Sequence, residues 1–114
     1  MSKRDIRLFL KDILAAINKT QRFVSGKTFE DFENDDLLID GVTRNLEVIG
    51  EAAKQIPDEF RSQHKEINWT QVVGFRNIAI HEYFEVDIEI VWTIATKQLD
   101  PIKAAIERML LKMK

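Results

Sequence analysis

The chain has 114 residues, 45% hydrophobic and 32% charged, a balance that favours a single folded domain spanning residues 1–114 over a disordered segment. Its formal net charge of -2 and its scattered basic residues predict only weak nonspecific attraction to nucleic acid, so any RNA binding requires a local site. The absence of cysteine excludes disulfides, thiolate nucleophiles and zinc–thiolate centres, and it is compatible with a reducing cytosol.

The N-terminal segment predicts an amphipathic helix rather than a secretion signal. Charged residues interrupt its apolar run, and Asp5 belongs to a polar start typical of a capped helix. Its apolar residues recur at three- and four-residue steps: Ile6, Phe9, Leu10, Ile13, Leu14 and Ile17. No apolar run approaches the roughly 20 residues needed to cross a bilayer, so we expect a cytoplasmic protein without membrane association.

After a connection rich in turn and capping residues, positions 25–36, the second helix has an unusually wide apolar face. Its main stripe is Leu38, Val42, Leu46, Ile49, Ala53 and Ile56, and it is flanked by Gly41, Val48 and Ala52 on one side and by Ile39 and Gly50 on the other. The apolar or small arc spans roughly 200°, well beyond the usual 100° or so. We interpret the surplus as a subunit interface; the alternative is a central helix covered by its own chain.

Two further long helices complete the prediction. Pro57 ends the second helix and is followed by a short helical segment, after which Asn68 and Asp87 can cap the last two helices. The final helix keeps one apolar phase through Pro101, which indicates a kinked or rejoined helix. The expected fold is all-α: an up-down four-helix bundle with a short extra helix and no strand, forming a homodimer.

The stretch FRNIAIHEYF, positions 75–84, gathers polar side chains at the end of the third long helix. In a regular helix Asn77 and His81 share a face, whereas Arg76 and His81 lie about 140° apart. Either the helix ends near Ile80 and the chain turns, or these groups converge with their copies across a dimer. From spacing alone, a polar helix end without function explains the stretch as well as a site does.

These residue types suit cleavage of RNA, which carries its own nucleophile in the ribose 2′-hydroxyl. Histidine has an ordinary pKa near 6.5, so His81 can take or give a proton, and Arg76 offers a fixed fork of donors for phosphate oxygens. Asn77 can bind phosphate or orient His81, and Tyr83 can contact phosphate or be modified. Such a scheme needs no metal or other cofactor, and the sequence shows no evident metal cluster.

The stretch and its flanks resemble the HepT toxins of the HEPN superfamily. The motif follows the family pattern Arg-x4-His-x-Tyr, and three further blocks are similar to family signatures: NLEVIGEAAKQIP at 45–57, INWTQVVGFRN at 67–77 and VDIEIVWTIATKQLDPIK at 86–103. The resemblance covers roughly residues 41–103. It implies a dimer of four-helix HEPN domains whose motifs face each other in a cleft and which acts as a metal-independent endoribonuclease, with tRNA among its substrates.

The resemblance also implies a role for each motif residue. Arg76 and His81 become the catalytic pair, Asn77 a supporting residue and Tyr83 the position to which an MNT antitoxin, a minimal nucleotidyltransferase, transfers AMP to silence the toxin. The alternative is a non-catalytic HEPN module that binds nucleotide or a nucleotidyltransferase.

Three charged residues of the second helix, Arg44, Glu47 and Glu51, form either a solvated, salt-bridged face or support for the cleft. Trp69 and Trp92 have apolar neighbours at helical spacing, and we expect them to pack in the core or an interface rather than against bases.

Overall fold

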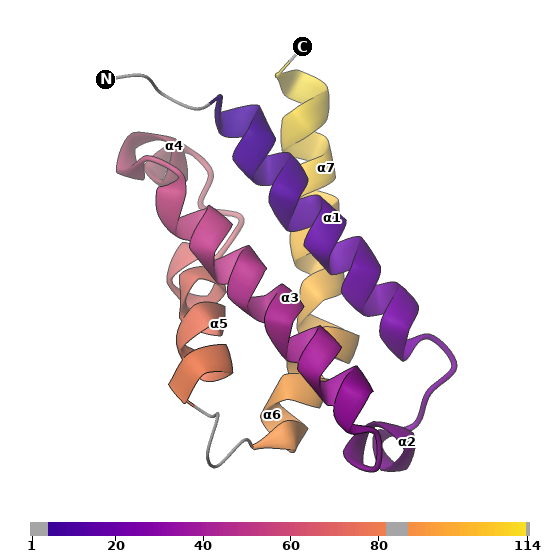
Figure 1. Cartoon of the computed structure of the whole chain (residues 1–114). Coiled ribbons are helices and arrows are strands. Elements are labelled where there is room, and N and C mark those ends of the chain that lie inside the picture. The colour runs from indigo at the N-terminus through magenta and orange to yellow at the C-terminus, as the bar shows by residue number, and fades with distance from the viewer. Residues whose placement is uncertain (1–4, 82–86, 114) are drawn as a thin grey trace.

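A computed structural model describes residues 5–81 and 87–113, with the backbone alone at positions 80 and 81. Throughout these residues the fold is helical, with no strand. The elements are α1 (Ile6–Val24), α2 (Phe29–Glu33), α3 (Asp36–Gln55), α4 (Asp58–Gln63), α5 (Trp69–His81), α6 (Ile88–Thr93), the π-helical turn η1 (Ile94–Gln98) and α7 (Leu99–Lys112). The long segments run alternately up and down the bundle (Figure 1). The all-α helical bundle expected from the sequence is therefore confirmed.

The helices begin where short polar side chains satisfy free backbone N–H groups. Asp5 accepts a hydrogen bond from the Arg7 amide at 2.9 Å, and Asp35 accepts one from Leu38 at 3.0 Å. The predicted caps at the two later helices are confirmed: Asn68 Oδ1 accepts from the Gln71 amide at 3.1 Å, and Asp87 caps α6 through the amides of its first turn.

One short helix was not expected. The connection 25–36 contains α2, because Thr28 and Asp31 form a reciprocal capping box in which each side chain bonds the other residue's backbone. Five residues are too few for apolar periodicity to reveal such a helix. Its Phe32 is fully buried and lies against the ring of Trp92, with centroids 5.2 Å apart. The described residues thus contain two short helices, α2 and α4, where the sequence predicted one.

The core lies around α3, whose apolar stripe is buried within its own chain. Helix α1 covers one side of α3 and α5 packs against the other (Figure 1). The small residues face these neighbours: a Cβ at Gly41 would lie 3.2 Å from the ring of Phe23, and Gly50 contacts α5. Our interpretation of these glycines as a subunit interface is therefore wrong, and the alternative of a central helix covered by its own chain describes them.

The tryptophans pack as expected. Trp69 is buried and its indole N–H donates to the carbonyl of His64 at 2.9 Å, while Trp92 is half-buried against the rings of Phe29 and Phe32. Both side chains therefore serve the packing of the bundle.

The final helical run rejoins around Pro101, as the sequence indicated. Segments α6, η1 and α7 follow one another without a break, and in the wide π turn the Leu99 amide donates to the carbonyl of Ile94. Pro101 cannot donate a backbone hydrogen bond, and its ring crowds the carbonyl four residues earlier. The π turn immediately before α7 accommodates both effects. No helix in the described part of the chain is long and apolar enough to span a bilayer.

Candidate active site

Helix α5 (Trp69–His81) carries the polar motif as far as His81, the last residue described before position 87. The alternative that the helix ends near Ile80 and the chain turns concerns residues after His81, which lie outside the described part of the chain. Because the helix is unbroken between them, backbone positions 76 and 81 lie about 7.5 Å apart along the axis and about 140° apart around it. The side chain of His81, and Tyr83 as a whole, lie outside the described residues.

The position of Arg76 depends on an unusually close approach of α3 and α5. A Cβ at Gly50 would lie 2.6 Å from the Arg76 amide nitrogen and 2.7 Å from its Cβ. Real Cβ atoms do not approach backbone that closely, so only glycine permits this contact. Gly50 therefore determines how closely the backbone of α5 at Arg76 packs against α3.

The guanidinium of Arg76 forms an ion pair with the carboxylate of Glu51, between Nε and Oε1. The Nε atom is shielded from solvent, although the Arg76 side chain as a whole is 38% exposed. The partly exposed guanidinium is available to an anion such as a phosphate. Asn77, the next residue of the motif, is exposed.

The three charged residues of α3, for which the sequence left open a solvated face or support for the cleft, make different contacts. Glu51 contacts Arg76, whereas Arg44 pairs with Glu47 at 3.0 Å along α3 itself. These three residues also line an open groove of about 280 Å³ between α1 and α3, together with Phe9, Asp12, Val48, Ala52 and Gln55. Among the described residues, Glu51 is thus the one of these three that contacts the motif directly.

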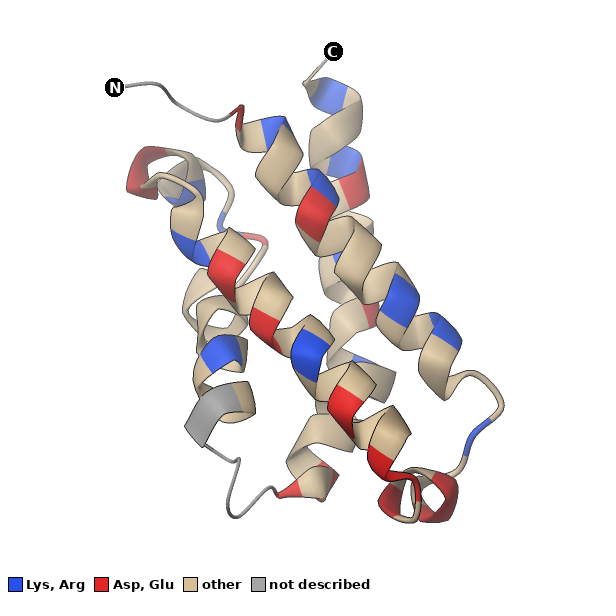
Figure 2. Cartoon of the chain, in the orientation of Figure 1, with Lys and Arg blue, Asp and Glu red and all other residues tan. Residues whose placement is uncertain are grey.

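The surroundings of the motif carry mixed charge. Figure 2 shows acidic residues interspersed with fewer basic ones along α3, and acidic residues at α2 and the start of α3. Acidic and basic residues are mixed over the helices in this view, in keeping with the net charge of -2. An anionic ligand would therefore be held at Arg76 by local contacts rather than drawn in by a long-range positive field.

Sequence reasoning missed the role of Gly50 and the buried hydroxyl of Thr43. Thr43 lies two turns before Gly50 on the same side of α3, and its Oγ1 has no hydrogen-bond partner among the described residues. No feature of the sequence marks Thr43, so only the tertiary structure reveals its buried hydroxyl. The Gly50–Glu51 dipeptide did give a signal, as a glycine beside a carboxylate on the broad face of α3.

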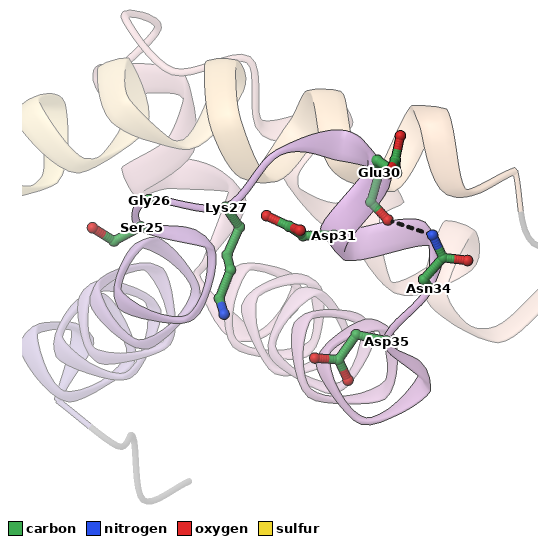
Figure 3. Close-up of a pocket in the computed structure, with 7 residues that line it drawn as sticks. All are labelled: Ser25, Gly26, Lys27, Glu30, Asp31, Asn34 and Asp35. Carbon is green, nitrogen blue, oxygen red and sulfur yellow. Dashed lines mark hydrogen bonds between the residues drawn. The ribbon is translucent and has the colours of Figure 1, made fainter.

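A second, polar pocket lies where α1 connects to α2. Ser25, Gly26, Lys27, Glu30, Asp31, Asn34 and Asp35 line it (Figure 3). Asn34 Nδ2 donates to the carbonyl of Glu30 at 3.0 Å across its wall. Figure 1 shows α2 well separated from α5, so this pocket is not part of the site around Arg76. Within residues 5–81 and 87–113, no group of three or more His, Cys, Asp or Glu side chains could hold a metal ion.

Comparisons with known proteins cover the helix that carries the motif. The family model described as "Ribonuclease HepT-like" matches residues 13–109, which include the whole motif. A Methanocaldococcus jannaschii protein named "Putative RNase MJ1380" is 38% identical over 107 residues, covering 94% of this chain and 98% of that protein. "Probable ribonuclease HepT" of Thermococcus cleftensis is 36% identical, with 94% and 97% covered. No solved structure matches the chain. The chain belongs to the HepT-like ribonuclease family.

Proposed function

We propose that this protein is a metal-independent endoribonuclease, with tRNA as its expected substrate class and Arg76 and His81 as its catalytic residues. One observation carries the proposal: the family match spans α5, where an intact Arg76 offers a partly exposed guanidinium five residues before His81. Relatives across nearly the whole chain are named as ribonucleases. As the toxin of a toxin–antitoxin pair, the protein would act in the cytoplasm.

The proposed reaction uses the ribose 2′-hydroxyl as nucleophile. One histidine takes the proton from this hydroxyl, the 2′-oxygen attacks phosphorus, and the bond from phosphorus to the 5′-oxygen breaks. A second proton donor protonates the leaving 5′-oxygen, which yields a 2′,3′-cyclic phosphate and a 5′-hydroxyl. The Arg76 guanidinium stabilises the charge that builds up on the phosphate oxygens, and Asn77 supports it.

The helical geometry supports a site shared between two copies of the chain. Backbone positions 76 and 81 diverge by about 140° on one helix, so a single α5 does not direct both toward one phosphate. A homodimer with two facing motifs would supply Arg76 and His81 from each copy. One His81 would then serve as the base and the other as the acid.

Incubation of the purified protein with total tRNA in EDTA tests the proposal. Wild type should cut tRNA, and Arg76→Ala and His81→Ala should each lower the rate by about 10²-fold or more. Arg108→Ala, which removes an exposed arginine of α7, is the matched control and should cut like wild type. If unmodified wild type cut no RNA, the chain would instead be a non-catalytic module that binds nucleotide or a nucleotidyltransferase.

We further propose that an MNT-type nucleotidyltransferase silences the protein by transferring AMP to Tyr83. An adenylyl group adds bulk and negative charge close in sequence to His81, which would repel the RNA backbone. Protein incubated with the nucleotidyltransferase and ATP should gain the mass of AMP on Tyr83 and lose cleavage activity. Tyr83→Phe should gain no mass and keep its activity; a modified Tyr83 with full activity would contradict the proposal.

A further inference from the structure

Consecutive residues of α3 hold Arg76 at two points. Gly50 lies against its backbone nitrogen and Cβ, and Glu51 forms the ion pair with its guanidinium. The backbone contact fixes the position of the Arg76 Cβ, and the ion pair fixes the position of its guanidinium. Because an arginine side chain has several rotatable bonds, a second point of contact removes much of its remaining freedom.

The ion pair with Glu51 engages Nε and leaves the two terminal guanidinium nitrogens for a phosphate. Glu51 Oε1 meets Nε, and that nitrogen is shielded from solvent. The Arg76 side chain as a whole is 38% exposed, so a ligand reaches the guanidinium from the side of its terminal nitrogens rather than at Nε. A phosphate can accept two parallel hydrogen bonds from these two terminal nitrogens.

The neighbouring carboxylate does not share this contact. Glu47 lies one turn before Glu51 on α3, and it pairs with Arg44 of the same helix at 3.0 Å. Its side chain is 33% exposed, comparable with 45% for Glu51. The two glutamates therefore carry the same charge in similar environments and differ in the arginine that each one holds.

From these contacts we propose that Glu51 is a positioning residue, which holds Arg76 by Nε so that its terminal nitrogens face the RNA phosphate. The inference rests on the proposed ribonuclease function and assigns Glu51 no proton transfer. Loss of this contact would leave the positive charge in place but free to move. The rate of the chemical step would fall, while RNA binding would not weaken, because a negative charge beside the backbone of RNA is removed.

Kinetics of Glu51→Gln and Glu47→Gln separate this role from a general effect of charge. Glu51→Gln should lower kcat by about tenfold or more, with KM unchanged or lower. Glu47→Gln removes an equal charge one turn away, and its effect on kcat should be much smaller. Equal effects of the two substitutions on kcat, or a higher KM with unchanged kcat in Glu51→Gln, would overturn the inference. Thermal unfolding of each variant identifies any loss of folded protein.

The nitrogen-15 NMR signal of the Arg76 Nε–H group tests the contact without RNA. The signal is assigned by its absence from Arg76→Lys. In wild type and Glu47→Gln it should exchange slowly with water, and in Glu51→Gln it should exchange faster. An unchanged exchange rate in Glu51→Gln would contradict the contact. Wild type that cut no RNA while this signal depended on Glu51 would refute the ribonuclease function and leave the contact standing.

Discussion

Among single residues, two glycines show how differently the bundle uses the same amino acid. Gly50 of α3 faces the backbone of Arg76 and Val73, with no room for a methyl group. Gly74 of α5 is also helical, yet a Cβ there would meet nothing within 4 Å. Gly50 is therefore required for packing, whereas Gly74 only weakens its helix through the flexibility of its backbone.

Alanine at the two positions should change stability in opposite directions. Gly50→Ala should lower the free energy of unfolding by about 1–3 kcal/mol, because backbone must move to admit the methyl group. Gly74→Ala should raise it by about 0.5–1 kcal/mol, because alanine favours the helix. Urea denaturation measures both. A neutral Gly50→Ala would show that α3 and α5 separate at little cost, contrary to the close contact described above.

Among the elements, α2 depends most on local side-chain chemistry. It has five residues, and Thr28 and Asp31 close its first turn. The backbone N–H and the hydroxyl of Thr28, with a smaller contribution from the charge of Lys27, hold the pKa of Asp31 below its ordinary value. The folded protein therefore favours the ionised form of Asp31 more than the unfolded chain does.

This lowered pKa predicts how stability depends on pH. The contribution of Asp31 is fully present above the carboxyl pKa of the unfolded chain and disappears as the pH falls through the lower pKa of the folded protein. Wild type should thus be more stable than Asp31→Asn at neutral pH, and the difference should shrink as the pH falls below the carboxyl pKa of the unfolded chain. Thermal unfolding across this range measures it, with Glu30→Gln as a control for charge in the same turn. A difference that grew at acidic pH would contradict the capping role.

The positions of the long helices could be predicted from the sequence, whereas the contacts between helices could not. Apolar periodicity and the caps at Asn68 and Asp87 locate the long helices, because both signals are local in the chain. The pairing of Glu51 with Arg76 could not be predicted, since residue spacing gives the face of a helix but not the partner that it meets. The motif blocks identified Arg76 and His81 as candidates, yet the role of Gly50 emerged only from the approach of two helices distant in sequence.

For the whole molecule, the proposed shared site makes activity a property of two chains. The protein should sediment as a dimer, and a dimer of wild type with His81→Ala should lose far more than half of the wild-type activity, because base and acid come from different copies. Differently tagged copies, purified together, provide this mixed dimer, and the His81→Ala homodimer provides the baseline. A loss of only half would show that each site works alone.

The two ends of the bundle carry different parts of the chain. Helix α1 begins and α7 ends at one end, whereas α5 ends at the other (Figure 1). A tag, a surface linker or a second domain joined beyond α1 or α7 would therefore lie away from the end of α5. Immobilised or tethered protein should accept long RNA as freely as the untethered chain, and joining two copies near these ends leaves the motif ends of both unobstructed.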